Sequence, residues 1–517
     1  MVVGVGVALA GSQAEARRDR TVTGDVIKAA RFLTTSRLDD AKLLLADLEK
    51  RASDMVEVKW LRAELAFQTG DYAGAVKLLD KLPDDAADGM VGQTRKLAAS
   101  TLGVTEGFIA TKSPKGHFVI LYAPGPDATI AELAGQVLDA AWDITGDDLG
   151  LRPDDPIRVE ILGEPAALAK LSPLSESEIE NTGTIALSKY NKLMVVSPRA
   201  TVFGYPWMDT LAHEYTHLVV SRISHDTVPI WLQEGLARFE QTRWRKPPEV
   251  ALSTTEQALL TAGLRKGRLI TFDEMHPSMA KLPSQEAAAL AYAEVYTLVG
   301  WMQQKIGYKG LRDLLVAQRD GKSARRAVAD AMSLTWPAVE KAWHTHLTAV
   351  PAKGDGKVRA GKPIKFGKGG VDSENVGIET VGVRARKHAR LGGMLRARGL
   401  LEAAATEYEK ALAVGGPEPF VGSKLARTLV DLGKLDRAIE LATPLVANDD
   451  HDATTAVTLG MARSARHDWP EAIAAYEQAL RVSPFDPQTR CGLAEAYGQT
   501  GDARATRERN ACDQLKN

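Results

Sequence analysis

The sequence contains little cysteine, almost no net charge and no long apolar run, and each absence excludes a class of protein. Two cysteines among 517 residues are too few for a disulfide scaffold or an all-thiolate zinc site. No apolar run reaches the roughly 20 residues of a transmembrane helix, so we expect no integral membrane segment. The 65 basic and 66 acidic residues give a net charge of −1, which argues against nucleic acid as a partner.

The composition that remains is that of a folded protein with several domains. Apolar residues make up 44% and charged residues 25% of the chain, close to globular averages. The length is about three times the roughly 150 residues of a usual domain. We therefore expect several hydrophobic cores.

The first ten residues, MVVGVGVALA, form an apolar stretch that ends in Ala8-x-Ala10. This stretch resembles the second half of a secretory signal peptide without its basic start. We expect residues 1–20 to be a signal-peptide remnant and tail, which predicts an exported protein, periplasmic or extracellular. The alternative is an ordinary chain end, in which case the protein is cytoplasmic.

A repeat of 34 residues is present near the end of the chain. Gly399, Gly433 and Gly501 occupy equivalent positions, and His467 fills the remaining one. Glycine permits the left-handed turn between two amphipathic helices. Five positions after Gly399, Gly433 and His467 comes a small residue that allows close helix packing: Ala404, Ala438 and Ala472. This pattern resembles a tetratricopeptide repeat (TPR) array over residues 385–517.

The same spacing occurs near the start of the chain. Ser36 is followed by Ala41, and Gly70, 34 residues later, is followed by Ala75. We expect TPR-like helical repeats over residues 21–103. Stacked repeats leave a concave groove, which predicts a protein partner in the TPR groove; the alternative is that the repeats are only spacers.

The two cysteines both fall in the last repeat. Cys491 is near the start of its first helix and Cys512 is near the end of its second, and these ends are neighbours in an antiparallel hairpin. A disulfide there would fit an exported protein. Two small buried residues at a helix contact would explain the same positions, so the sequence leaves both alternatives open.

The middle of the chain has a different pattern, which predicts an α+β domain over residues 104–350. Short apolar runs, separated by helical periodicity, indicate strands at residues 117–124, 157–162, 184–188 and 192–198. Helices dominate from Pro206 onward. Residues 351–384 begin with a stretch rich in Gly and Lys and are expected to be a linker.

One motif in this domain indicates a metal site with a general base beside it. His213-Glu214-Tyr-Thr-His217 is an H-E-x-x-H sequence within a predicted helix over residues 207–223. Residues four apart share a helix face, so both imidazoles can bind one Zn²⁺. Glu214 then lies beside the open side of the metal, where a general base for water is needed.

A third ligand is expected from the next helix. Glu234 follows His217 by 17 residues within W-x-x-E-G-x-A, and an antiparallel helix would return it to the metal. Gly235 and Ala237 would let this helix pack closely against the first.

The paired motifs H-E-x-x-H and W-x-x-E-G-x-A resemble those of the gluzincin metallopeptidases, in particular peptidase MA-like domains attached to TPR arrays. The resemblance covers about residues 180–350. It implies a multidomain protein with an α+β zincin-like metallopeptidase domain between α-helical TPR solenoid segments. It also implies one Zn²⁺ per chain, held by His213, His217 and Glu234, and hydrolysis of a peptide or protein substrate by a metal-activated water with Glu214 as general base.

Three further roles follow from the resemblance. The strand at residues 184–188 would be an edge strand that aligns an extended peptide beside the metal. A downstream tyrosine would stabilise the oxyanion, and we favour Tyr292 over Tyr296, although both could be core aromatics. Asp209 is a candidate to orient a histidine.

A second class of function fits the same features. The chain could be a non-catalytic TPR scaffold whose zincin domain binds zinc or peptide without cleaving it. The ligands and the base are all intact, which favours the enzyme.

Overall fold

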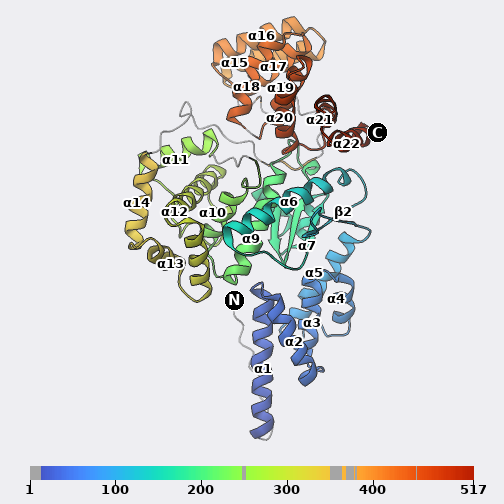
Figure 1. The fold of residues 1–517 in the computed structure, drawn as a ribbon, viewed down its shortest axis with the longest axis vertical. Helices are drawn as coiled ribbons and strands as arrows, with labels where there is room; N and C mark the ends of the chain where they lie inside the picture. Colours follow the sequence, from blue (N-terminus) through green and yellow to red (C-terminus); the bar gives the residue numbers. More distant parts are fainter. Residues whose placement is uncertain are drawn as a thin grey trace.

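The structure is a computed structural model, and it describes residues 13–246, 252–349, 364–367, 378, 381–449 and 451–516. N-terminal helices, a mixed domain and C-terminal helices follow one another along the long axis (Figure 1). The predicted export signal at residues 1–10 lies outside the described residues, as does much of the predicted linker. None of the described helices combines the length and the apolar character that crossing a membrane requires.

The N-terminal block consists of helical hairpins. Its helices are α1 (Gln13–Thr34), α2 (Leu38–Ala52), α3 (Val56–Gln68), α4 (Tyr72–Leu79) and α5 (Met90–Thr105). The two predicted turn residues, Ser36 and Gly70, have φ angles of 58° and 87°, so both take the left-handed conformation. Ala41 and Ala75 are buried in the hairpins. The two turns therefore lie where the 34-residue spacing places them, and the small residue after each turn is buried.

A five-stranded mixed sheet lies at the centre of the middle domain, in the order β1-β2-β3-β5-β4. Its strands are β1 (Ile109–Lys112), β2 (Phe118–Tyr122), β3 (Ile157–Leu162), β4 (Ala186–Lys189) and β5 (Lys192–Val196). β2, β3 and β5 are parallel, whereas β1 and β4 pair antiparallel to their neighbours. β4 is an edge strand, as the resemblance implied. The sequence missed β1, because it is short and mostly exposed and so lacks an apolar run.

Helices cover both faces of this sheet. The helices of the middle domain are α6 (Ala128–Leu149), α7 (Pro165–Leu171), α8 (Glu176–Thr182), α9 (Trp207–Ser224), α10 (Ile230–Glu240), α11 (Thr254–Lys266), α12 (Gln285–Arg319), α13 (Ala324–Ala331) and α14 (Trp336–Ala349), with short 3-10 turns η1 (Pro198–Ala200) and η2 (Met279–Lys281). Of these, α6, α7 and α9 pack directly on the strands. Leu193 and Val195 of β5 face the core that contains α6 and α9. Met194 and Val196 face a second core with α7. A strand buried on both faces explains the continuous apolar run in its sequence.

The C-terminal block repeats one helical hairpin. Its helices are α15 (Val383–Ala397), α16 (Leu401–Gly415), α17 (Pro419–Asp431), α18 (Leu435–Asn448), α19 (Ala453–Ala465), α20 (Trp469–Leu480), α21 (Pro487–Thr500) and α22 (Ala505–Lys516). The four predicted turn residues, Gly399, Gly433, His467 and Gly501, have φ angles of 74°, 70°, 62° and 72°. The repeat therefore imposes the left-handed turn even where histidine replaces glycine.

The last hairpin is cross-linked. Cys491 of α21 and Cys512 of α22 form a disulfide. Of the two alternatives that the sequence left open, the structure contains the covalent one.

The N-terminal repeats are fixed to the sheet by a buried polar cluster. Lys192 Nζ lies 2.8 Å from Glu160 Oε2 and donates to the Tyr72 hydroxyl at 2.9 Å. Tyr72 in turn donates to Glu160. These three side chains are almost completely buried, so each charge depends on the others for compensation.

The C-terminal repeats share a hydrophobic core with the middle domain. Trp207 of α9 and Tyr476 of α20 belong to the same cluster of buried residues. The buried guanidinium of Arg490 joins the two blocks as well, because it donates to the carbonyl of Thr129 at 3.1 Å. The C-terminal array is therefore packed against the middle domain.

Part of the predicted linker is bound to the middle domain. Val202 N–H donates to the carbonyl of Lys365, and Gly367 N–H donates to that of Ala200, both at 2.9 Å. Residues 364–367, which belong to the predicted linker, therefore run along the domain surface. Residues 351–363 lie outside the described residues.

Candidate metal centre

Two consecutive helices carry the predicted ligands. His213 and His217 lie one turn apart on α9, and Glu234 lies on α10. The chain reverses between them because His225, which caps α9, and Asp226 have φ angles of 54° and 57°. A Cβ on Gly235 would lie 3.0 Å from the Val295 carbonyl. Gly235 therefore permits close packing of α10 against α12, and the expectation that it faces α9 is corrected.

The ligand atoms of the three side chains form a compact triangle. The Nε2 atoms of His213 and His217 are 3.1 Å apart, and Glu234 Oε2 is 3.4 Å and 3.7 Å from them. Tetrahedral zinc with bonds of about 2.0–2.1 Å places its ligand atoms about 3.3 Å from one another. The triangle therefore has the dimensions of three corners of a zinc tetrahedron.

Two glutamines determine which ring nitrogen of each imidazole faces this triangle. Gln241 Oε1 lies 3.3 Å from Nδ1 of His213, and Gln233 Oε1 lies 3.0 Å from Nδ1 of His217. A carbonyl oxygen accepts only, so each neutral imidazole carries its proton on Nδ1 and turns an Nε2 lone pair inward.

With both imidazoles neutral, three acceptor atoms thus converge without a donor between them. Glu234 Oε2 is buried and has no hydrogen-bond partner among the described atoms. Burial alone would lower the pKa of His217, but Glu234 and Glu214 raise it to about 9. Both observations indicate that the centre requires a positive charge, and the donor set of two imidazoles and a carboxylate is one that Zn²⁺ accepts.

Glu214 is the second carboxylate of the centre. One potential ligand atom from each of His213, Glu214 and His217 falls within 4.8 Å of the others, so distance alone admits Glu214 as a ligand. The backbone N–H of Ser188 donates to the Glu214 carboxylate, whereas Glu234 Oε2 lies 3.4 Å and 3.7 Å from the two Nε2 atoms. Glu234 is therefore the candidate for the third corner. Burial raises the pKa of Glu214, although the two histidines partly oppose the shift.

Tyr292 and Tyr296 differ in their surroundings. The Tyr292 hydroxyl hydrogen-bonds the Glu234 carboxylate, and the charge of Glu234 together with burial raises its pKa well above the ordinary value. Tyr296 packs on Phe239 with ring centroids 6.0 Å apart, and its hydroxyl has no hydrogen-bond partner among the described atoms. The structure brings Tyr292 to the centre, and Tyr296 belongs to the surrounding core.

Asp209 has a different role from the one suggested by the sequence. It accepts from Trp244 Nε1 at 3.0 Å and from Arg245 Nε at 3.0 Å. The described hydrogen bond of His213 Nδ1 goes to Gln241 instead. Asp209 therefore anchors the start of α9 to the segment that follows α10.

Neither glutamine is predicted from the sequence. Gln233 adjoins Glu234, and this adjacency was an available signal. Gln241 caps the C-terminus of α10, 28 residues after the histidine that it contacts. No local pattern marks it, because its role depends on how α9 and α10 cross.

The edge strand borders the centre. β4 pairs with β5 along one side, and it packs against α9. Ser188 on this strand contacts Glu214, as described above. The other side of β4 has no neighbour in the described sheet, so it can accept an extended chain by strand addition.

Models of known families match three parts of the chain. Residues 141–349 match the family model of the Peptidase MA superfamily. The middle of the chain carries a Peptidase MA superfamily domain. TPR matches flank this domain, at residues 28–89 (tetratricopeptide repeat) and 462–501 (TPR repeat). The Peptidase MA match contains His213, Glu214, His217, Glu234 and Tyr292.

Other comparisons add little. No curated protein matches the chain. Among solved structures, MamA from Desulfovibrio magneticus RS-1 is 18% identical over 28% of this chain and 86% of its own, with a TM-score of 0.24. The APC/C hetero-tetramer Cut9-Hcn1 is 14% identical over 96% of this chain and 87% of its own, also with a TM-score of 0.24. At these scores the similarities carry no argument about fold or function.

Proposed function

We propose that the chain is a zinc-dependent metallopeptidase of the gluzincin type, whose repeats recruit a substrate or a partner protein. The observation that carries this proposal is the convergence of His213 Nε2, His217 Nε2 and Glu234 Oε2 within 3.1–3.7 Å. The three side chains keep 14–15% of their surface exposed, so solvent reaches part of each ligand side chain. A catalytic zinc site needs such an open position.

The proposed chemistry divides between the metal and Glu214. When bound, zinc polarises the scissile carbonyl and makes water more acidic. Glu214 takes a proton from the attacking water and delivers it to the leaving nitrogen. The pKa of Glu214, raised by burial, makes the carboxyl a better proton acceptor and brings it closer to the working pH.

Three other groups position the reactants. Gln233 and Gln241 hold the imidazoles in one tautomer and orientation. Tyr292, with its raised pKa, keeps its proton and can donate to the developing oxyanion. The free side of β4 aligns an extended substrate beside the centre.

Degradation of a mixed peptide library, followed by mass spectrometry, tests the activity. We expect cleavage by the zinc-loaded protein and none by Glu214→Gln, which removes the base and preserves the size of the side chain. Equal zinc content in both proteins shows that the variant still holds the metal. Cleavage by Glu214→Gln would contradict the assignment, and His213→Ala should lose the zinc.

The flanking TPR matches support a second candidate, a non-catalytic scaffold with a zinc- or peptide-binding domain. Zinc content does not separate the two candidates, because both hold the metal. Absence of cleavage by the zinc-loaded wild type, with binding retained, would favour the scaffold.

We also propose that the protein is exported. The cross-link between Cys491 and Cys512 supports this, because disulfides persist in oxidising compartments. Fractionation of the native host should find the chain outside the cytoplasm, and a cytoplasmic chain with reduced thiols would contradict the proposal.

A further inference from the structure

The turn between β4 and β5 contains a residue that does not favour its conformation. Tyr190 and Asn191 form this turn, and their φ angles are 53° and 57°. A two-residue hairpin turn with both residues at positive φ normally uses Asn and Gly. Asn191 fits this preference, whereas a bulky aromatic residue at positive φ is uncommon. Such backbone strain persists only where the surrounding structure imposes it, so contacts outside the hairpin hold Tyr190 in place.

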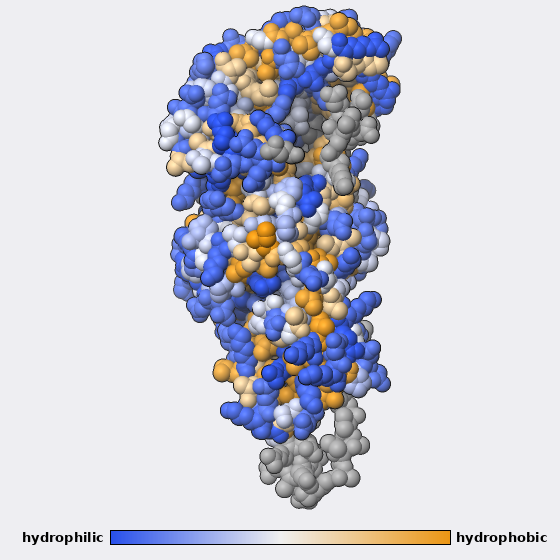
Figure 2. Space-filling model, turned by 90° about the vertical axis from the view of Figure 1, so that its right-hand side faces the viewer, coloured by the Kyte–Doolittle hydropathy of each residue, from blue (hydrophilic) through white to orange (hydrophobic). Residues whose placement is uncertain are grey.

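Those contacts come from the N-terminal repeats. Tyr190 belongs to the middle domain by its position in the chain, but its side chain packs against the hydrophobic cluster of the repeats. Its ring meets the Phe67 ring of α3 edge-on, with the centroids 5.3 Å apart. The N-terminal block lies below the middle domain in Figure 2, and the two form one continuous surface there. The edge hairpin therefore carries one aromatic ring into the core of the repeats.

Two neighbouring residues are also bound at this end of the hairpin. Asn191 Oδ1 accepts from Arg222 of α9 at 2.5 Å, and buried Lys192 donates to the Tyr72 hydroxyl of α4. β4 itself has only four residues, and a hairpin this short has little stability of its own. Its position in the molecule therefore depends on these contacts at the turn.

The position of this hairpin matters for the candidate metal centre. Ser188 lies on β4 close to the turn, and its backbone N–H donates to the Glu214 carboxylate. The side of β4 that can accept an extended chain has no neighbour in the described sheet. A displacement of the turn would therefore move both the donor to Glu214 and the edge that aligns a substrate.

We propose that Tyr190 is a positioning residue, whose ring, packed into the N-terminal repeats, holds the β4–β5 hairpin where β4 can align an extended substrate beside Glu214. The proposal rests on the proposed peptidase function. It gives the N-terminal repeats a role besides recruitment, because they complete the substrate-binding edge of the middle domain.

Two substitutions separate the ring of Tyr190 from the conformation of the turn. Tyr190→Asn removes the ring and introduces a residue that favours positive φ. Tyr190→Phe keeps the ring and removes only the hydroxyl. If the ring holds the hairpin, the Asn variant loses this function and the Phe variant retains it. If only the turn conformation matters, the Asn variant behaves like the wild type.

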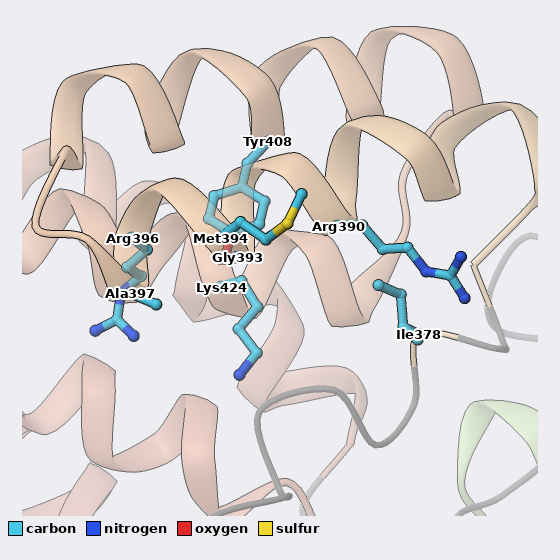
Figure 3. Close-up of a pocket in the computed structure, with 8 residues that line it drawn as sticks. All are labelled: Ile378, Arg390, Gly393, Met394, Arg396, Ala397, Tyr408 and Lys424. Atoms are coloured by element: carbon cyan, nitrogen blue, oxygen red, sulfur yellow. The ribbon is translucent and has the colours of Figure 1, made fainter.

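Tyr408→Ala is the control for loss of an aromatic ring from a repeat core. Tyr408 is buried in α16, and Figure 3 shows its ring beside Gly393 and Met394 of α15. These helices lie at the opposite end of the molecule from α3 (Figure 1). Circular dichroism checks the fold of each variant.

Amide hydrogen exchange of the full zinc-loaded chain, measured by mass spectrometry without substrate, tests the positioning directly. Tyr190→Asn should speed exchange in residues 186–189 about ten-fold, the effect of losing one well-packed aromatic pair. Tyr190→Phe and Tyr408→Ala should leave the exchange of this segment unchanged. The measurement does not depend on cleavage.

Steady-state kinetics on a peptide identified from the library test the consequence for substrate. Tyr190→Asn should raise KM about ten-fold at unchanged zinc content, because the aligning edge is no longer held in place. Tyr190→Phe should keep the wild-type KM. A merely structural loss would reduce the amount of folded enzyme, which lowers the apparent kcat and leaves KM unchanged.

Two results would overturn the proposal. One is wild-type exchange of residues 186–189 in Tyr190→Asn, and the other is a lower kcat in this variant without any change in KM. Absence of cleavage by the zinc-loaded wild type would instead overturn the proposed function, and the exchange measurement would still decide whether Tyr190 holds the hairpin. The two proposals therefore fail separately.

Discussion

Trp207 and Leu480 are joined by a hydrogen bond from the indole N–H to the carbonyl oxygen, with a length of 3.0 Å. Trp207 is the first residue of the helix that carries both histidines, and Leu480 is the last residue of α20 in the C-terminal array. Tyr205 N–H donates to the Val482 carbonyl at 3.1 Å beside this contact. The N-terminal end of α9, the helix that carries both histidines, is therefore hydrogen-bonded directly to the C-terminal repeats.

Gly204→Ala should disturb this junction. Gly204 has a φ of 71°, and a Cβ there would lie 2.1 Å from the Val482 carbonyl oxygen. Gly501 has nearly the same φ, 72°, with no atom within 4 Å of its Cβ position, so Gly501→Ala is a matched control for backbone strain. We expect Gly204→Ala to lower the free energy of unfolding by about 2 kcal/mol more than the control, measured by urea denaturation. Equal losses would show that the close approach does not matter.

Gln241→Leu should weaken zinc binding, because it removes the acceptor that orients His213. Loss of a hydrogen bond that orients a metal-ligating histidine typically lowers the metal affinity about 10- to 100-fold. Gln241→Glu keeps an acceptor at the same distance and should retain the affinity. Competition with a chelator of known affinity measures the dissociation constant. If the Leu and Glu variants bind zinc equally, the hydrogen bond to His213 has no role in holding the metal.

Tyr292→Phe and Tyr296→Phe form a matched pair, since each removes one hydroxyl from the same helix. Tyr292→Phe should lower kcat about 100-fold, the usual effect of losing one donor to an oxyanion. Tyr296→Phe should leave kcat unchanged, because its hydroxyl has no described partner. The measurement is steady-state kinetics on a peptide identified from the library. Similar kcat values for the two variants would refute the role of Tyr292.

The stability of the protein should fall as the pH rises from about 4.3 to about 8, in part because of Glu294. Burial raises the pKa of Glu294 to about 8, whereas an unfolded Glu has a pKa of about 4.3. The native state therefore holds more protons than the unfolded state in this window, so the free energy of unfolding falls with pH and levels off above pH 8.

Glu294→Gln keeps an acceptor for the Ile270 N–H, which donates to Glu294 at 2.9 Å, and cannot ionise. It should flatten the dependence of stability on pH, measured by urea denaturation at several pH values. Glu495→Gln, at an exposed position, is the control and should leave the slope unchanged. An unchanged slope in Glu294→Gln would contradict the prediction.

Short-range features of the molecule could be predicted from the sequence. The 34-residue spacing located every repeat turn named above, including His467, whose φ of 62° no composition rule would suggest. The H-E-x-x-H spacing placed His213 and His217 on one face of a helix, because the helical period is a local property. The edge position of β4 followed from the resemblance.

Long-range features could not be predicted in this way. The partners of Gln241 and Asp209, the neighbour of Gly235 and the binding of residues 364–367 to the domain all depend on which elements pack together. The sequence placed Cys491 and Cys512 near each other but could not distinguish a disulfide from two buried thiols.

The sequence by itself determined where the helices turn, which residues could bind a metal, and that two helical blocks flank a mixed domain. These features depend on local periodicity and on residue chemistry. Only the tertiary structure decided that Glu234 meets both histidines without a donor between them. It also decided that the C-terminal repeats share their core with the domain. These relationships arise when surfaces distant in the chain bury each other, and their energies depend on contacts that no sequence spacing encodes.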